Sequence, residues 1–424
     1  MDTIPFHFLM IALDIVLCGF LIFWLIFNFR FVGIGGRDSG VDIYYEVPLS
    51  GSDRGDSELL SKGDSLADNF WFRKFIWRLF GVVLGGVICL FGIVFFAVIF
   101  RRNFGQCFVE GLTFHVGFYL LFSSVLLFIL RSYIVGVILF LFGVIVVVLG
   151  VDMLYIEPNN LVYEYYRLES PKARSAFRVV FVADIQTDNI GEYERRTLRM
   201  IMDAKPDLII LGGDYLQYYA GTVGVSMLPE RFRQLFKEIP LEAELGVYAV
   251  AGNVDYSSGE QFSELFKDTT VEPIFSSEMI NNLGEEEGKG PIDIKFLSVV
   301  DSINGGLGET LLSKSGNFTI VVGHYPNYAI KDYQFSDRAP DLMLAGHTHG
   351  GQIYIPFFGA LRVKYTHREA VITQEFLRGM KRFKNGGNLL ITRGSGMERG
   401  WAPRVRFLCK PEISVIDVEP TKKK

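Results

Sequence analysis

The feature that most constrains this chain is the concentration of apolar residues before residue 151. Four stretches there are long enough to cross a hydrocarbon core, which takes about 20 helical residues. They are Phe6 to Phe29, Leu79 to Phe100, Leu112 to Leu130 and Tyr133 to Val151. We therefore expect a transmembrane anchor over residues 1–151, with four helices and a flexible loop over 35–69 that is too polar to fold alone.

The composition supports a membrane protein and limits its partners. Half of the 424 residues are hydrophobic and 38 are Phe, which is typical of a chain with membrane helices. A net charge of -5 argues against nucleic acid as a partner. Of the cysteines, only Cys409 follows the apolar part, so a metal there must be bound by His, Asp, Asn or Gln.

Loop charges bear on the topology of the expected anchor. An even number of spans places the N-terminus and the part of the chain after residue 151 on the same side of the membrane. Basic residues in the first loop place that side outside the cytoplasm by the positive-inside rule, whereas Arg101 and Arg102 in the second loop argue the opposite. The first span ends in Phe29-Arg30 and not in a small-residue cleavage site, so we expect an uncleaved anchor.

From Phe177 onward, the chain repeats a short apolar run that ends in Gly, Asp, Asn or His. Such runs predict the buried strands of an α/β domain, here over residues 177–183, 208–211, 247–251, 318–322 and 342–345. Apolar residues recur at helical spacing over 194–204 and 229–239. Polar residues at the carboxyl ends of strands are where open α/β sheets place their sites.

Seven polar side chains stand just past these strand ends. They are Asp184, Gln186, Asp214, Asn253, His324, His347 and His349. Oxygen and nitrogen ligands without sulfur suit Mn²⁺, Fe, Zn²⁺ or Mg²⁺, and their number suits two ions that share one carboxylate. We therefore predict a binuclear metal centre in a domain over 177–424, joined to the anchor by a connector over 152–176.

These motifs resemble those of the calcineurin-like metallophosphoesterases, whose series is Asp-x-His, Gly-Asp, Gly-Asn-His, Gly-His and Gly-His-x-His. The most specific match is Gly346 to Ile353, and the resemblance covers about Phe177 to Val418. It implies a two-sheet β-sandwich flanked by helices. The segments Ile391 to Gly396 and Pro403 to Ile413 are similar to the membrane-associated branch that includes the UDP-2,3-diacylglucosamine diphosphatases of lipid A synthesis.

Carried over to this sequence, the resemblance implies two ligand sets. The first metal would be held by Asp184, Gln186, Asp214 and His349, and the second by Asp214, Asn253, His324 and His347. It makes Asp214, Asn253 and His347 the expected catalytic residues, around a water that the two metals acidify. Arg393, just past a late strand, either binds a phosphate oxygen with its planar fork or has a structural role.

Two positions depart from the family pattern. Gln186 replaces a histidine, and an amide oxygen is a harder ligand, so we expect Mn²⁺ or Mg²⁺ in preference to Zn²⁺. Val254 replaces the histidine that would assist the leaving group, a contribution typically worth about 10²–10⁴-fold. The expected substrate is therefore a phosphoanhydride or phosphodiester with a good leaving group, linked to a lipid because the anchor holds the site near a bilayer.

Two questions stay open at this point. Because two histidines are missing, the alternative function is a catalytically weak metal-binding or regulatory membrane module of the same fold. The side of the membrane is the second question: a nucleotide-lipid substrate is made in the cytoplasm, whereas the charge of the first loop places the domain outside it.

Overall fold

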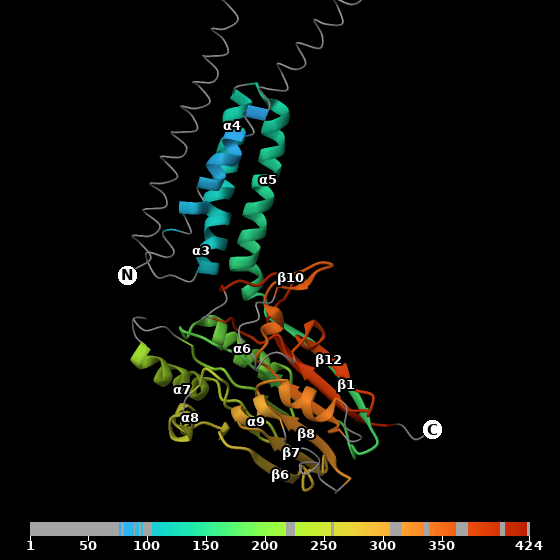
Figure 1. Cartoon of the computed structure of the whole chain (residues 1–424). Helices are drawn as coiled ribbons and strands as arrows, with labels where there is room; N and C mark the ends of the chain where they lie inside the picture. Colours follow the sequence, from blue (N-terminus) through green and yellow to red (C-terminus); the bar gives the residue numbers. More distant parts are fainter. Residues whose placement is uncertain are drawn as a thin grey trace, which may run out of the picture. The chain divides into compact units, whose positions relative to one another are not determined.

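The computed structural model describes most of the second half of the chain and part of the first (Figure 1). The described residues are 76–77, 80–88, 90–92, 95, 104–129, 131–217, 225–255, 258–305, 316–334, 339–361, 372–398 and 403–421. The chain divides into two compact units, residues 1–151 and 152–424.

The N-terminal unit contains a helical hairpin. Helix α3 (Phe104–Glu110) continues through the π-helix η1 (Gly111–Val116) into α4 (Gly117–Ile129), and α5 (Tyr133–Val151) follows. The continuous segments 105–129 and 133–159 are long and apolar enough to cross a membrane. They overlap the third and fourth expected spans. A Cβ at Gly143 would lie 3.1 Å from Leu121, so this glycine lets α4 and α5 approach closely.

The other expected spans are not described as membrane helices. The first span, 6–29, and the loop 35–69 lie outside the described residues. Within the second span, 79–100, helical residues are described at 80–88, 90–92 and 95, and the other positions of the span lie outside the described residues. Two membrane-length helices, in place of the four expected, are therefore found in the described part of the chain, and the count of four stays a prediction.

The second unit contains two six-stranded sheets. The order in the first is β1 (Val162–Ser170), β14 (Glu412–Pro420), β2 (Phe177–Val182), β3 (Leu208–Leu211), β4 (Val247–Val250) and β5 (Glu272–Ile274). The order in the second is β12 (Gly379–Arg382), β13 (Asn388–Ile391), β9 (Leu342–Ala345), β8 (Phe318–Val322), β7 (Ile292–Phe296) and β6 (Glu278–Leu283).

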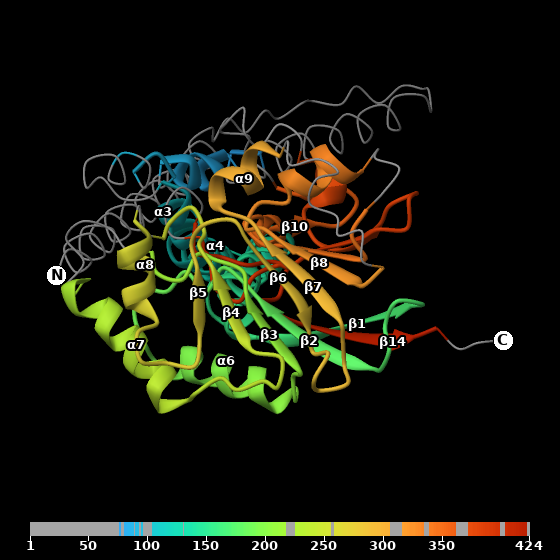
Figure 2. The same cartoon turned by 90° about the horizontal axis from the view of Figure 1, so that it is seen from below.

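Strand direction places the polar ends together. Strands β2 to β5 are parallel to one another, as are β13, β9, β8 and β7 in the second sheet. The two sheets lie face to face, with α6 (Glu192–Asp203) and α7 (Leu228–Glu238) outside the first and α9 (Val299–Asn304) outside the second (Figure 2). Buried side chains of both sheets, such as Phe181, Ile210 and Phe318, form one core between them. This confirms the expected α/β fold with two sheets.

The five predicted strands and two predicted helices are confirmed to within two residues. The expected connector, 152–176, contains strand β1, which pairs in parallel with β14 from Val162–Glu412 to Ser170–Pro420. Helix α6 packs its apolar stripe, including Leu198 and Ile201, against the outer face of the first sheet. Burial of that stripe fixes the parallel strands whose ends carry the candidate ligands.

Candidate metal centre

All seven predicted ligands follow the strands to which the sequence assigned them. Asp184 and Gln186 follow β2, Asp214 follows β3, and Asn253 follows β4 in the first sheet. His324 follows β8, and His347 and His349 follow β9 in the second sheet. Strand direction thus brings residues from five loops to one edge of the sandwich.

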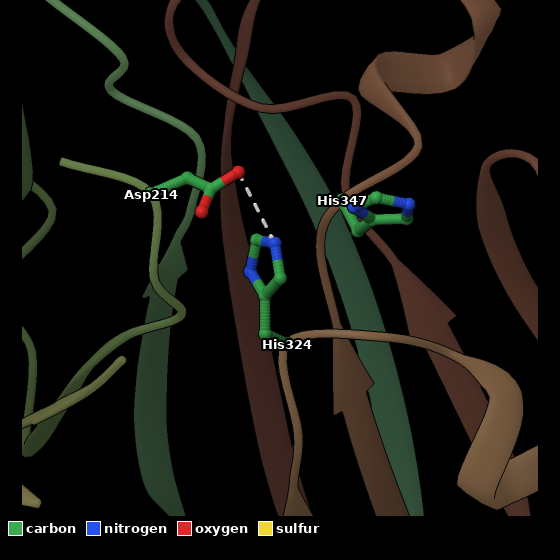
Figure 3. Close-up of side chains that lie close together, drawn as sticks. All are labelled: Asp214, His324 and His347. Atoms are coloured by element: carbon green, nitrogen blue, oxygen red, sulfur yellow. Dashed lines mark ion pairs between the residues drawn. The ribbon is translucent and has the colours of Figure 1, made fainter. Parts of the chain in front are cut away.

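Side chains of the second predicted ligand set converge tightly. Asp214, His324 and His347 each offer one ligand atom, and these atoms lie within 4.8 Å of one another (Figure 3). Asp214 Oδ2 lies 3.2 Å from His324 Nε2. Asn253 Oδ1 lies 3.1 Å from His324 Nε2 and 2.9 Å from His347 Nδ1. Two oxygens and two imidazole nitrogens therefore surround one point.

The backbone fixes the orientation of the His324 ring. Its Nδ1 lies 2.8 Å from the carbonyl oxygen of Gly212, so that nitrogen donates and Nε2 faces Asp214. Burial lowers the pKa of His324, but the carboxylates of Asp214 and Asp184 outweigh this and raise it to about 9. Negative charge that holds a proton on Nε2 would equally attract a cation, to which neutral Nε2 can bind.

The first predicted ligand set is less complete in its contacts. The Asp184 carboxylate accepts the backbone N–H of His347 at 3.1 Å, and Gln186 Nε2 donates to Asp214 Oδ2 at 2.9 Å. Exchange of the two amide atoms of Gln186, which are not distinguished by shape, would turn its oxygen toward the same point. His349 Nε2 lies 4.0 Å from Asp184 Oδ1.

His349 is the clearest indication that an ion belongs here. Its side chain is buried, and neither ring nitrogen has a hydrogen-bond partner among the described residues. Burial lowers the pKa of His349 well below its usual value, and Arg406 adds to this, so the imidazole is neutral and ready to bind a metal. The 4.0 Å gap to Asp184 is about twice a metal–ligand distance of ~2.0–2.2 Å. The residues present therefore fit a divalent ion.

The backbone around the centre is unusually shaped. Five candidate ligands have positive φ, a conformation that is uncommon outside glycine, namely Asp184 (55°), Gln186 (38°), Asp214 (59°), His347 (69°) and His349 (48°). A Cβ at Gly252 would lie 2.1 Å from Asp214 Oδ1, so only glycine fits there. Such backbone conformations gather at functional sites, where the surroundings hold them in place.

Asp255 is a residue that the sequence interpretation missed. Its carboxylate accepts the backbone N–H groups of Asp214 at 2.8 Å, Tyr215 at 2.9 Å and Gly252 at 2.6 Å. Burial, with the neighbouring charge of Asp214, raises the pKa of Asp255 to about 6. It joins the loops after β3 and β4, which carry two ligands. The only sequence signal was an acidic residue directly after Gly252-Asn253-Val254.

Arg406 supports the loop after β13 and was also missed. It is fully buried, and its guanidinium donates to the carbonyl oxygens of Arg393 at 2.8 Å and Cys409 at 2.9 Å, and also to Gly394 and Gly396. The loop so held contacts the first ligand strand, since Gly396 N–H donates to Asp184 O at 2.7 Å. A buried arginine at this place has no local sequence signal.

The predicted phosphate ligand Arg393 already has partners. Its Nη2 lies 2.5 Å from Glu164 Oε1, its Nε lies 2.6 Å from Glu412 Oε2, and its side chain is 16% exposed. Glu164 is in β1 and Glu412 begins β14, so these ion pairs join the paired strands to the loop after β13. Of the two roles expected for Arg393, this geometry favours the structural one.

Val254, at the position of the family's histidine, offers no proton donor in its side chain, and its backbone N–H donates to Asp214 Oδ1 at 2.9 Å. A carboxylate lies near Gln186 of the first ligand set: Glu398 Oε1 accepts from Gln217 Nε2 at 2.8 Å, and Glu398 Oε2 lies 3.5 Å from Gln186 Nε2. Glu398 was not predicted as a site residue, and it places a negative charge beside the first ligand set.

A cavity of about 290 Å³ lies behind the loop that carries Asp184 and Gln186. It is lined by Ile185, Tyr193 and Ser395, together with the acidic side chains of Asp188, Glu192 and Glu194. An acidic lining disfavours a phosphate group. Asn253 is exposed and His347 partly exposed. An anionic substrate can therefore reach the centre from the side on which Asn253 and His347 lie.

Comparison with known proteins agrees with this geometry. The family model described as calcineurin-like phosphoesterase matches residues 177–351. An uncharacterized metallophosphoesterase of Bacillus subtilis, YkuE, is 27% identical over 286 residues, which cover 63% of this chain and 88% of that protein. The phosphodiesterase YaeI of Escherichia coli is 27% identical over 279 residues, covering 63% of this chain and 91% of that protein.

A more distant relative has a specific substrate in its name. The UDP-2,3-diacylglucosamine pyrophosphatase LpxG of Chlamydia trachomatis is 22% identical over 311 residues, which cover 62% of this chain and 90% of that protein. Among solved structures, GAP50, the anchor in the inner membrane complex of Plasmodium, is 13% identical, with 54% of this chain and 75% of that chain covered. Its TM-score is 0.28, a value too low to bear on the fold.

Proposed function

Given that this chain carries a calcineurin-like phosphoesterase domain and is thus a hydrolase of phosphate ester bonds, we propose that it is a membrane-anchored diphosphatase. Its substrate is a lipid-linked phosphoanhydride of the UDP-2,3-diacylglucosamine type. The observation that carries the proposal is the convergence of Asp214, Asn253, His324 and His347 beside a buried His349 whose ring nitrogens have no hydrogen-bond partner among the described residues.

The ligand sets assign a role to each residue of the centre. Asp184, Gln186 and His349 would hold one divalent ion, Asn253, His324 and His347 would hold the other, and Asp214 would serve both. When bound, such a pair of ions acidifies a water molecule and neutralises charge on the phosphoryl oxygens. His347 and Asn253 lie on the accessible side, where they contact the phosphate and align it for in-line attack.

The leaving group follows from what stands beside the centre. Val254 can neither donate nor accept a proton through its side chain, so a departing alkoxide would leave without protonation there. A departing phosphate needs no proton, because its charge is stable at neutral pH. This favours a phosphoanhydride over an alkyl phosphate ester. The name of the relative LpxG, a pyrophosphatase that acts on UDP-2,3-diacylglucosamine, supports the same bond type.

The ligand chemistry also favours one metal. Gln186 offers an amide oxygen where a softer imidazole would favour Zn²⁺, and Asp184, Asp214 and Asn253 add further oxygen donors. Mn²⁺ binds to both oxygen and imidazole ligands, so we propose Mn²⁺ as the resident ion at both positions. Mg²⁺ is the next best match for the oxygen-rich first set.

The lipid part of the proposal rests on the apolar helices. The segments 105–129 and 133–159 are membrane-length helices, and the second leads directly into the phosphoesterase unit. A site tethered in this way meets lipid-linked substrates at high local concentration. We propose a multi-pass anchor of four helices, with the phosphoesterase unit in the cytoplasm, where a nucleotide-lipid is made. Reporter fusions after Lys424 test this placement: reporter activity on the outer side would contradict it.

Three substrates test the reaction itself. Purified full-length protein with Mn²⁺ is assayed on UDP-2,3-diacylglucosamine, on bis-p-nitrophenyl phosphate and on an alkyl phosphate monoester, beside Asp214→Ala. We expect fast turnover of the first, measurable turnover of the second and little of the third, with all activity lost in the variant. Equal background turnover by both proteins would instead indicate a metal-binding module without catalysis.

Val254→His tests the argument from the leaving group. An imidazole at this position restores a proton donor, so alkyl monoester hydrolysis should rise by about tenfold or more, whereas anhydride hydrolysis should stay within about twofold. The leaving-group argument fails if the two substrates respond equally.

A further inference from the structure

The strongest unexplained surface feature of the phosphoesterase unit is a short hairpin just after the loop that carries His347 and His349, here called the metal loop. Strands β10 (Tyr354–Ile355) and β11 (Gly359–Ala360) pair in antiparallel fashion. Four large apolar side chains of the hairpin and its exit are exposed: Ile355 (36%), Phe357 (104%), Phe358 (84%) and Leu361 (58%). We call these four residues the apolar tip.

The conformation of the apolar tip is costly for an isolated water-soluble domain. Phe357 has φ 69°, a left-handed conformation that is a genuine outlier for a bulky residue. Two adjacent phenylalanines also leave nearly all of their surface in water, where burial would be favourable. Elsewhere in the described part of this unit, exposed large apolar residues such as Tyr165, Met227 and Val300 occur singly, apart from the adjacent pair Tyr155 and Ile156 at the end of the helix 133–159. The gathering of four indicates a contact surface.

The base of the hairpin is firmly held. Tyr354 N–H donates to Phe407 O at 2.8 Å, and Leu361 N–H donates to Ile353 O at 2.8 Å. The Gln374 amide makes two hydrogen bonds to Ala360, of 2.9 and 2.7 Å. The hairpin also follows the turn His349–Gly351, which contains a candidate metal ligand. A contact made by the apolar tip therefore fixes the position of the metal loop.

Cationic and aromatic groups surround the base. The Arg378 guanidinium lies 4.0 Å from the centroid of the Tyr354 ring and donates to Leu408 O at 3.1 Å. Leu408 is 48% exposed, and Lys410 follows two residues later. Aromatic rings with adjoining Arg or Lys are characteristic of the boundary between lipid headgroups and acyl chains, where the rings enter the apolar layer and the cations meet phosphate.

The size of the apolar tip also argues for lipid. Two phenylalanines and two aliphatic side chains expose on the order of a few hundred Å², whereas a stable protein interface buries about 800 Å² on each partner. A lipid bilayer needs no matching surface, and it is already near if the helices 105–129 and 133–159 span it.

We propose that the apolar tip inserts into the interfacial layer of a lipid bilayer and so presents the metal centre to the headgroup phosphates of a lipid-linked substrate. This inference rests on the proposed membrane anchoring and lipid substrate. It adds a second contact between enzyme and membrane, made by the phosphoesterase unit in addition to the helices.

Tryptophan fluorescence of the full chain in nanodiscs tests the insertion. Phe358→Trp places a reporter in the apolar tip, and Tyr165→Trp, in β1 with an exposed fraction of 62%, is the matched control. Each variant is compared with wild type, which contains four Trp, in nanodiscs of ordinary and acyl-brominated phosphatidylcholine. We expect blue-shifted emission from residue 358 that bromine quenches about twofold or more, and no change for residue 165.

Each other outcome overturns the proposal in a distinct way. Unquenched, water-like emission from residue 358, with native Trp quenched, would show a membrane protein whose tip stays in water. A blue shift without bromine quenching would show burial against protein, for example a second copy.

Activity gives an independent readout. The double variant Phe357→Ser with Phe358→Ser should raise KM for the lipid-linked substrate about tenfold and leave turnover of bis-p-nitrophenyl phosphate unchanged. Unchanged KM for the lipid would contradict the inference, and absence of turnover by wild type on every substrate would instead contradict the proposed function.

Discussion

The two ligand sets of the metal centre differ in how fully the polypeptide assembles them. In the second set, Asn253 Oδ1 lies within 3.1 Å of nitrogens from His324 and His347, and Gly212 fixes the His324 ring. In the first set, His349 stands 4.0 Å from Asp184 and its ring nitrogens have no hydrogen bond to any described residue. The second ligand set is therefore organised by protein contacts, whereas the first would be completed only by a bound ion.

Removal of the shared carboxylate should erase this difference. Asp214→Ala takes a ligand from both sets and leaves His324 without its ion-pair partner, so we expect loss of both metals and a fall in turnover of at least about a thousandfold. Metal content by mass spectrometry and hydrolysis of bis-p-nitrophenyl phosphate measure the two effects. Retention of one tightly bound equivalent would mean that Asp214 does not bridge.

Substitution of one histidine from each set should separate the two positions. His324→Ala and His349→Ala should each reduce bound Mn²⁺ from two equivalents to about one. Without metal, however, His324→Ala should lower stability more, because it breaks the ion pair with Asp214 and the contact to Gly212. His349→Ala removes a buried group whose lack of partners costs about 1–3 kcal/mol, which offsets part of the lost packing.

The check is thermal unfolding of each variant with and without Mn²⁺. We expect Mn²⁺ to raise the Tm of wild type strongly and the Tm of both variants by less. Equal effects of the two substitutions in the metal-free protein would contradict the difference between the two sets.

Weakening of the protein scaffold should reduce metal affinity without touching a ligand. Asp255→Asn replaces a carboxylate that accepts three backbone N–H groups with an amide that has a single acceptor oxygen, so affinity for Mn²⁺ should fall by about 10–100-fold. The matched control is Asp301→Asn, since Asp301 accepts from Ser298 at 2.9 Å in α9 and not from a ligand loop. Titration calorimetry distinguishes the two, and an equal loss of affinity in both would indicate a general folding defect.

The smallest expected effect concerns Gln186 and tests whether it belongs to the first ligand set. Gln186→His introduces the imidazole of the family pattern, so affinity for Zn²⁺ should rise about tenfold while that for Mn²⁺ changes little. Competition between the two ions for the purified protein measures this ratio. A ratio equal to that of wild type would exclude Gln186 from the metal shell.

The sequence predicted those parts of the fold that local pattern determines. Strands β2, β3, β4, β8 and β9 are largely apolar runs followed by polar residues, and each was expected within a residue of its observed bounds. Strand β1, by contrast, alternates exposed and half-buried residues, such as Glu164 and Arg167, at the edge of a sheet. Its partner β14 lies some 250 residues away, so only the tertiary structure reveals the pairing.

The same distinction holds for the centre. Candidate ligands were recognisable because Asp, Asn and His stand directly after strands, beside the glycines that let the chain turn. Asp255 and Arg406 act through backbone groups, several of them in other loops. The only local signal for Asp255 is an acidic residue after Gly252-Asn253-Val254, and Arg406 has none. Arg393 was identified as a charged residue near the site, but its two carboxylate partners come from β1 and β14.

The most direct test is to count metal ions and relate them to hydrolysis. Full-length protein is stripped with a chelator, titrated with Mn²⁺, and assayed for bound metal and for hydrolysis of bis-p-nitrophenyl phosphate. We expect no turnover without metal, two bound equivalents at saturation, and activity that appears only as the second equivalent binds. Full turnover by the stripped protein, or no metal bound at any concentration, would contradict this expectation.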